Sequence, residues 1–213
     1  LIHDDLPAMD NDDFRRGKPT NHKVYGEGMA ILAGDALLTL AFEVMLRQKN
    51  APFERLLAVV GEMSAAAGMN GMVGGQALDL ESEGKTIDLD TLQKMHVGKT
   101  GALFRAAIRS GAILAGAHGP KLSALASYAN LFGLAFQITD DILDVTGDEQ
   151  TLGKPVGSDE RNQKSTYVSL LSLEQAREMA KSAVENANAS LRLFGEEADF
   201  LREVAVSLLD RIN

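Results

Sequence analysis

The sequence has 213 residues, 45% of them hydrophobic and 24% charged, as expected for one globular domain with a sizeable core. Its net charge of −9 argues against a nucleic-acid partner, because phosphates require a basic surface. The lack of cysteine excludes disulfides and zinc–thiolate sites, and no uninterrupted apolar run reaches the roughly 18 residues of a membrane span. Helical periodicity dominates, and no segment alternates as a strand does, so we expect an all-α protein.

An acidic cluster opens the chain, with Asp4, Asp5 and Asp10 as its members of interest. Pro7 disfavours the helical conformation for Leu6, so we expect a helix to end near Asp5 or Leu6. The chain would then curl until Asp10 returns toward the aspartate pair. Residues 11–26 are polar and rich in turn-forming residues, which predicts a loop.

Two apolar helices are predicted next, from Gly28 to Arg47 and from Pro52 to about Ala67. The first contains small residues that allow another helix to approach closely, namely Ala30, Ala33, Gly34 and Ala36. It also contains one carboxylate, Asp35, which we interpret as buried and hydrogen-bonded rather than as a metal ligand.

Three glycines interrupt the helical pattern before Gln76 and Asp79: Gly71, Gly74 and Gly75. Glycine permits close packing against a neighbouring helix or a kink. After a loop at residues 81–88, a helix is predicted from Asp90 to Ala117. It carries Lys99, whose apolar flanks favour an inward-pointing cation that binds phosphate over the usual solvated lysine.

A second acidic motif lies in an otherwise apolar helical stretch, residues 131–145. Asp140 and Asp144 are four residues apart and share one helical face, which Asp141 borders and Gln137 extends by one turn. A buried cluster of carboxylates is costly unless cations offset it. Because all the ligands would be oxygens, the motif predicts a hard ion such as Mg²⁺.

The remaining segments complete the predicted bundle. Pro120 begins the helix that carries the second acidic motif, and residues 149–164 form a loop that we interpret as a flexible lid. Helices at 172–193 and 198–212 close the bundle by core packing, the first with Ser172 as its N-cap. Five cations along the chain are suited to hold a substrate phosphate beside Mg²⁺: Arg15, Arg16, Lys99, Lys154 and Lys164.

Six stretches occur in an order that resembles one known family. They are DDLPAMD with the nearby RRG, LAGDALL, GGQALDL, KTGALF, FQITDDILD and GKPVGSDERNQKSTY. Together they cover essentially the whole chain and resemble the trans-isoprenyl diphosphate synthases. The four residues between Asp5 and Asp10 resemble the bacterial farnesyl and geranylgeranyl type. One acidic motif alone would be weak support, because any acidic helix can mimic it.

The resemblance implies an isoprenoid-synthase-type helical bundle around a central cavity, formed as a single domain by residues 1–213. It implies a Mg²⁺-dependent prenyltransferase that condenses isopentenyl diphosphate with an allylic diphosphate, in a cytoplasmic homodimer. The family carries further N-terminal helices with an isopentenyl-diphosphate element, and these are absent from this chain. The family's chain-length determinants would also lie upstream of Leu1, so farnesyl, geranylgeranyl and geranyl products all stay open.

The resemblance also implies a role for each motif residue. Three Mg²⁺ ions would be held by Asp4, Asp5 and Asp10 on one side and by Asp140 and Asp144 on the other. Asp141 belongs to the second metal cluster and would orient Lys154 or a bound water. The allylic diphosphate would be bound by Arg15, Lys99, Lys154 and Lys164, and isopentenyl diphosphate by Arg16. Thr100 and Gln137 would lie beside the reacting carbons, and Gln76 and Asp79 would bind water around the metal.

None of the four histidines is predicted to be a metal ligand. His22 and His118 lie in connections and are expected to be solvated. His96, three residues before Lys99, could border the cavity, and His3 could orient the carboxylate of the neighbouring Asp4.

Other readings of the same residues remain open. His3-Asp4 could begin a metal-dependent phosphohydrolase site, although the other histidines lack the context of ligands. A terpene cyclase shares the first motif, and a head-to-head synthase shares the chemistry, but their second acidic motifs differ from this one. The non-enzyme alternative is an inactive regulatory subunit, against which the intact motifs argue.

Overall fold

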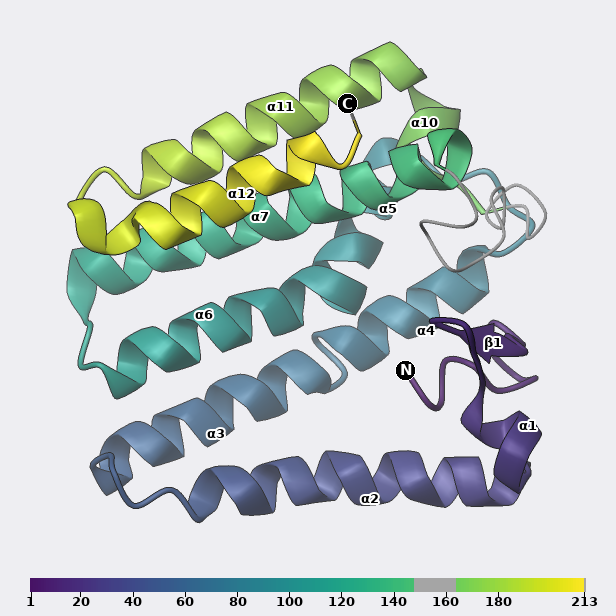
Figure 1. Ribbon diagram of the computed structural model, residues 1–213, viewed down its shortest axis with the longest axis horizontal. Helices are drawn as coiled ribbons and strands as arrows, with labels where there is room; N and C mark the ends of the chain where they lie inside the picture. The colour runs from purple at the N-terminus through teal and green to yellow at the C-terminus, as the bar shows by residue number, and fades with distance from the viewer. Residues whose placement is uncertain (148–163, 213) are drawn as a thin grey trace. The chain divides into compact units, whose positions relative to one another are not determined.

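The computed structural model describes residues 1–147 and 164–212. These form two compact units, residues 1–50 and residues 51–147 with 164–212, which are described separately below. Helices make up most of the described chain, so the predicted all-α class is confirmed (Figure 1).

The first unit contains a small hairpin and two helices. Strand β1 (Phe14–Arg15) pairs antiparallel with β2 (Lys18–Pro19), and α1 (Asn21–Tyr25) and α2 (Glu27–Leu46) follow. The prediction of a loop at 11–26 without strands is therefore wrong. The two residues of the hairpin turn, Arg16 and Gly17, have φ angles of 54° and 73°, and such left-handed turns match the twist of paired strands. Strands of two residues are too short to show alternation in the sequence.

Helix α2 agrees with the predicted helix to within one residue at each end. It is separated from α1 by Gly26, whose φ of 85° ends the first helix and redirects the chain. Asp35 on α2 is exposed, so the interpretation of a buried carboxylate is wrong.

The second unit contains the remaining helices. In chain order they are α3 (Phe53–Ala67), α4 (Met72–Ser82), α5 (Leu89–His96), a π-helical turn (Val97–Gly101), α6 (Ala102–Leu114), α7 (Gly119–Thr146), α10 (Tyr167–Leu170), α11 (Leu173–Ser190), a 3₁₀ turn (Glu196–Ala198) and α12 (Asp199–Asp210). The predicted N-cap is confirmed, since Ser172 accepts a hydrogen bond from the backbone N–H of Gln175.

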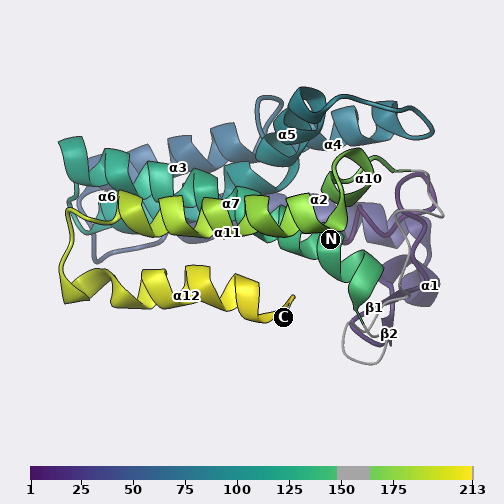
Figure 2. The same ribbon diagram turned by 90° about the horizontal axis from the view of Figure 1, so that it is seen from above.

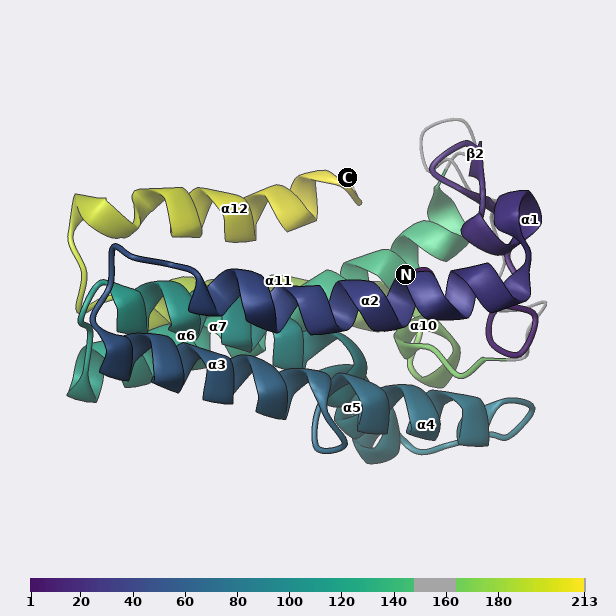
Figure 3. The same ribbon diagram turned by 90° about the horizontal axis from the view of Figure 1, so that it is seen from below.

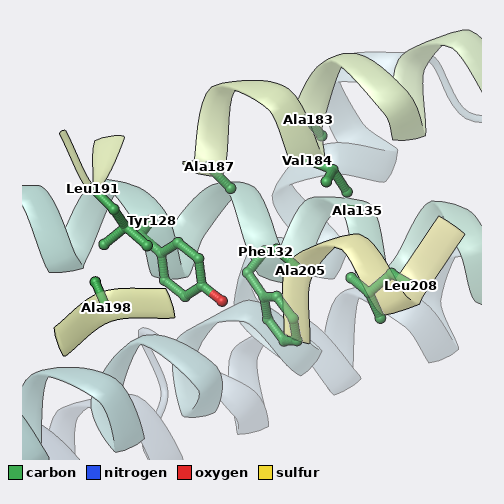
Figure 4. Close-up of a cluster of buried hydrophobic side chains, with 10 residues drawn as sticks. All are labelled: Tyr128, Phe132, Ala135, Ala183, Val184, Ala187, Leu191, Ala198, Ala205 and Leu208. Atoms are coloured by element: carbon green, nitrogen blue, oxygen red, sulfur yellow. The ribbon is translucent and has the colours of Figure 1, made fainter. Parts of the chain in front are cut away.

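The core of this unit lies where α11 and α12 run alongside α7 (Figures 1 and 2). Tyr128 and Phe132 of α7 pack there against small and aliphatic residues of the other two helices (Figure 4). The Tyr128 hydroxyl donates to the Leu201 carbonyl at 2.6 Å, so this buried polar group is satisfied. The prediction that the last helices serve core packing is thereby confirmed.

Helices α3 and α4 follow each other nearly in line (Figure 3). Helix α3 packs on α6, where Arg109 makes a bidentate ion pair with Glu62 at 2.6 and 2.9 Å. Such fork-shaped pairing is the strongest geometry for a salt bridge, so it fixes the register of the two helices.

By length and composition, two described helical stretches could cross a membrane, Glu27–Leu46 and Phe53–Ser82. The sequence-based expectation missed them because it required an uninterrupted apolar run, whereas α2 contains Asp35 and Glu43. Core helices of soluble proteins meet the same test, so neither stretch identifies a membrane span.

Candidate active site

The first acidic motif forms the predicted curl. The Asp10 N–H donates to the Asp4 carbonyl at 2.9 Å, and the Asn11 N–H donates to the Leu6 carbonyl at 3.1 Å. The residues before Pro7 form hydrogen-bonded turns rather than the expected helix end. Asp10 is therefore returned to the aspartate pair by backbone hydrogen bonds within the motif.

A guanidinium group already bridges this motif. Arg15 donates to Asp5 Oδ1 through Nε at 2.7 Å and lies 2.5 Å from the same oxygen through Nη2. Its Nη2 is also 3.8 Å from Asp4 Oδ2, and the hydrogen bond to Asp5 raises the pKa of Arg15. The buried Asp5 thus holds one of the cations predicted to bind diphosphate. Arg16, in the turn of the hairpin, is exposed.

Asp12 belongs to the same electrostatic cluster, although it was not among the predicted ligands. Partial loss of hydration, followed by repulsion from Asp10, raises the pKa of Asp12, while Arg15 acts in the opposite direction. Its place two residues after Asp10 is the signal that could have identified it.

His22 is buried, so the expectation of a solvated side chain is wrong. The Thr20 hydroxyl donates to the Asp12 carbonyl at 2.7 Å, which leaves its oxygen to accept from His22 Nδ1 at 3.2 Å. This chain of bonds fastens the end of the hairpin to helix α1.

His3 contacts helix α2 instead of orienting Asp4. Its Nε2 lies 2.8 Å from the Ile31 carbonyl and 3.7 Å from Asp35 Oδ1. The ring fits there because residue 34 is glycine: a Cβ at that position would lie 2.2 Å from His3 Nε2. The small residues of α2 thus accommodate the acidic turn.

We expect Gly34→Ala to displace His3 and, with it, the neighbouring Asp4 and Asp5. Turnover should fall about tenfold, because a displacement near 1 Å is sufficient for such losses. The unfolding free energy should change by less than about 1 kcal/mol, since the atoms that the new Cβ meets belong to the end of the His3 side chain, which can rotate aside without moving the backbone. The control is Gly28→Ala on the same helix, where a Cβ meets nothing within 4 Å. Equal turnover in the two variants would contradict the role of His3.

In the second unit, Lys99 pairs with the buried Asp79. Lys99 Nζ donates to Asp79 Oδ2 at 2.6 Å, and Lys164 Nζ lies 3.7 Å from the same oxygen. Burial raises the pKa of Asp79, but the two ammonium groups outweigh it and hold that pKa below its ordinary value. The predicted inward orientation of Lys99 is supported, and one carboxylate gathers two of the predicted diphosphate-binding cations.

Glycines position this pair. Lys99 lies in the π-helical turn, which interrupts the single helix predicted for residues 90–117. A Cβ on Gly75 would lie 2.0 Å from the Lys99 backbone nitrogen, so α4 contacts this turn backbone to backbone. The Cβ of a residue at 133 would likewise meet Gly101 at 3.2 Å. π-Helical turns are frequent at functional sites, and here the turn is held by glycine contacts on both sides.

The pairing of Asp79 predicts how stability depends on pH. Because the folded-state pKa of Asp79 lies below its unfolded value, its contribution is fully present above the unfolded pKa near 3.8 and is lost as pH falls through the folded pKa. We therefore expect Asp79→Asn to lose less stability than the parent between pH 5 and pH 2 in urea unfolding. The control is Asp90→Asn, which removes an exposed carboxylate on α5. An unchanged pH dependence in Asp79→Asn would contradict this prediction.

A second hydrogen-bonded group connects the predicted reaction-site residues. The Thr100 hydroxyl donates to Gln137 Oε1 at 3.3 Å, and Gln137 Nε2 donates to Asp141 Oδ1 at 2.9 Å. The other oxygen of Asp141 accepts from the Tyr167 backbone N–H at 2.8 Å. The helical face predicted for Gln137 and Asp141 is therefore present on α7.

His96 lies in the second unit, near Asp79 on one side and Tyr167 on the other. Its ring packs against Tyr167 at 5.4 Å between centroids. Burial lowers the pKa of His96 to about 4, while nearby Asp79 acts in the opposite direction. The imidazole is therefore neutral at pH 7, and it is not a third cation for a phosphate.

Several features of the predicted site stay predictions. Lys154 and most of the predicted lid lie outside the described residues. Within residues 1–147 and 164–212, no group of three or more His, Cys, Asp or Glu side chains is arranged to hold a metal ion. The two acidic motifs belong to different units, so a shared central cavity stays a prediction. The role of Gln76 in binding water around the metal also stays a prediction.

The helical fold, together with the acidic and basic side chains described above, indicates the class of protein. This is a mainly helical protein with two carboxylate motifs that lack nitrogen or sulfur donors. Arg15 accompanies the first motif, and Lys99 and Lys164 pair with a separate buried carboxylate, Asp79. Such donor sets suit hard divalent ions and phosphorylated substrates.

The comparisons identify the family. The polyprenyl synthetase family profile matches residues 1–199, and the chain belongs to this family, as the sequence motifs predicted. It is 52% identical over 213 residues to a dimethylallyltranstransferase of Fischerella ambigua, covering 99% of this chain and 62% of that protein. It is 52% identical over 201 residues to the Escherichia coli farnesyl diphosphate synthase, covering 93% of this chain and 67% of that protein.

Solved structures agree with the family. Geranylgeranyl pyrophosphate synthetase from Pyrococcus horikoshii is 35% identical with a TM-score of 0.90, covering 99% of this chain and 75% of that one. A geranyltransferase from Helicobacter pylori, in complex with magnesium and isoprenyl diphosphate, is 36% identical with a TM-score of 0.86, covering 99% of this chain and 69% of that one. The chain thus spans about two thirds of the length of these relatives.

Proposed function

We propose that the protein to which this chain belongs is a short-chain prenyltransferase. It condenses isopentenyl diphosphate with an allylic diphosphate and releases diphosphate, giving farnesyl or geranylgeranyl diphosphate. The observation that carries this proposal is the clustering of carboxylates with cations in a chain of the polyprenyl synthetase family: Arg15 pairs with Asp5 of the first acidic motif, and Lys99 and Lys164 lie against Asp79, a buried carboxylate outside both motifs. The names of the relatives support the same reaction.

The carboxylates would hold Mg²⁺. The candidate ligands are Asp4, Asp5, Asp10, Asp140 and Asp144, with three ions in the complete site, and Asp141 lies within the second cluster as an orienting residue. These all-oxygen donors fit a hard ion, and the guanidinium of Arg15 shows that the first motif attracts a cation. When bound, Mg²⁺ supplies positive charge that stabilises the diphosphate as it leaves. The magnesium complex of the Helicobacter pylori relative supports this cofactor.

The basic side chains would bind the substrates. Arg15, Lys99, Lys154 and Lys164 would bind the allylic diphosphate, and Arg16 would bind isopentenyl diphosphate. Because Asp79 already holds Lys99 and Lys164 together, an arriving diphosphate meets a preorganised pair of cations. Fixed charges of this kind stabilise a leaving anion without reorganisation during the reaction.

The bond-forming step needs no nucleophilic side chain. Loss of diphosphate from the allylic substrate leaves a carbocation, which the double bond of isopentenyl diphosphate attacks, and a proton is then lost to the released diphosphate. Thr100 and Gln137 would lie beside the reacting carbons, where their bonded pair presents a fixed dipole.

Assembly and location are part of the same proposal. We propose a single-domain subunit with a central cavity, in a cytoplasmic homodimer. The large apolar side chains that α2 leaves exposed, among them Leu32, Leu37 and Val44, support the dimer, and the bacterial relatives support the location. Light scattering on the whole protein tests the dimer, and a monomeric mass would contradict it.

Product analysis of the whole protein tests the function. The protein is incubated with Mg²⁺, labelled isopentenyl diphosphate and, separately, the C5, C10 and C15 allylic diphosphates. The expected result is one short prenyl diphosphate, whose length also identifies the product. Release of free phosphate without elongation would instead indicate a hydrolase, and a cyclised hydrocarbon would indicate a cyclase.

A further inference from the structure

Asp141 differs from the residue beside it on helix α7. The residue is 3% exposed, and each carboxylate oxygen accepts a hydrogen bond from the protein. Asp140, the preceding residue of the same acidic motif, is only partly buried. Two adjacent carboxylates of one motif therefore have different surroundings.

We propose that Asp141 is a positioning residue that sets the hydrogen-bond polarity of the Thr100–Gln137 pair, and that it is not a ligand of Mg²⁺. The proposal rests on the proposed function, because it assigns a role within the prenyl-transfer site.

The polarity follows from the chemistry of the groups. A carboxylate only accepts hydrogen bonds, so the amide nitrogen of Gln137 must face Asp141 Oδ1 at 2.9 Å. The amide oxygen of Gln137 then faces Thr100 and accepts its hydroxyl proton at 3.3 Å. Asp141 thereby fixes the orientation of the Gln137 amide. It also fixes Thr100 as the hydrogen-bond donor of the pair, which leaves the lone pairs of the Thr100 oxygen for the reaction site.

The second oxygen of Asp141 extends this control to another element. It accepts from the backbone N–H of Tyr167 at 2.8 Å, at the first residue of α10. Lys164 lies three residues before this anchor and reaches Asp79, the partner of Lys99. One buried carboxylate thus ties α7 to the segment that delivers a predicted diphosphate-binding lysine.

Asp141→Asn is the discriminating variant, because it preserves shape and keeps an acceptor for the Tyr167 N–H. Its new amide donor faces Gln137, so the Gln137 amide must turn over and Thr100 must accept instead of donate. We expect kcat to fall at least tenfold with little change in the KM for either substrate.

A charge-conserving exchange is the matched rescue. In the double variant Asp141→Asn with Gln137→Glu, the new amide at position 141 donates to the carboxylate introduced at position 137. That carboxylate again accepts from the Thr100 hydroxyl. The net charge equals that of the parent, and the hydrogen-bond polarity is restored. We expect the double variant to regain at least half of the fall in log kcat that Asp141→Asn causes alone.

Two readouts do not depend on turnover. Manganese titration by electron paramagnetic resonance, with inorganic pyrophosphate present, should give the parent ion count for Asp141→Asn and a lower count for Asp140→Asn. Hydrogen exchange should show a Tyr167 amide that is protected in the parent and in Asp141→Asn, and exposed in Asp141→Ala.

Either of two results would overturn the proposal: loss of a bound ion in Asp141→Asn, or no recovery of kcat in the double variant with its ion count intact. Should the parent protein make no prenyl product, the proposed function fails. The ion counts and the Tyr167 exchange would then still decide whether Asp141 is a ligand or an anchor.

Discussion

Replacing Asp140 with alanine is expected to lower kcat/KM about a thousand-fold, because a metal-held charge on a leaving diphosphate contributes several kcal/mol to the transition state. Asp4→Ala in the first motif should have an effect of the same order. Both side chains are partly buried and belong to the motifs that lack nitrogen and sulfur donors. Their loss removes a predicted ligand without creating a large cavity, so the fold should be retained.

Steady-state kinetics of the whole protein, with circular dichroism to verify folding, measures this prediction. Asp90→Ala is the matched control, since it removes an exposed carboxylate that pairs only locally with Lys94. The control should keep parental rates. A folded Asp4→Ala or Asp140→Ala variant with near-parental turnover would show that the metal assignment is wrong.

The second large effect is expected for Lys99→Met, which keeps the apolar stem and removes the ammonium group. We expect kcat/KM to fall about a hundred-fold, because charge-assisted hydrogen bonds to a diphosphate are among the strong ones. Stability should also fall by about 1–3 kcal/mol, since among the described residues the buried Asp79 would keep one cation, Lys164, at 3.7 Å. Lys94→Met, on the exposed face of α5 one turn earlier, is the control.

A double variant separates the two consequences of losing Lys99. Asp79→Asn combined with Lys99→Met removes the unpaired buried charge, so stability should return toward the parent while activity stays low. Recovery of activity together with stability would mean that Lys99 acts through folding alone and does not bind substrate.

Much of the fold follows from local patterns in the sequence. The apolar period of α7, Pro120 at its start and Ser172 at the N-cap of α11 each predicted an element that is present. Local sequence patterns did not predict the hairpin or the π-helical turn. The first depends on left-handed backbone angles at two residues, and the second on a glycine contact between Gly75 and the turn that carries Lys99.

The candidate site shows the same division. Pro7 predicted the curl that returns Asp10 to Asp4, because a proline restricts the residue before it. The pairs Arg15 with Asp5 and Lys99 with Asp79 join residues ten and twenty positions apart, and no sequence period selects them. The burial of His22 was missed for the same reason: its partner hydroxyl is committed by a tertiary contact to Asp12.

On the proposed function, charged groups of this protein ionise an allylic diphosphate before the new carbon–carbon bond forms. Single-turnover elongation of geranyl diphosphate and of its 2-fluoro derivative by the whole protein tests this most directly. Fluorine withdraws electrons from the allylic system and destabilises a carbocation, so ionisation predicts elongation slower by orders of magnitude with binding little changed. Equal rates for the two substrates would contradict it.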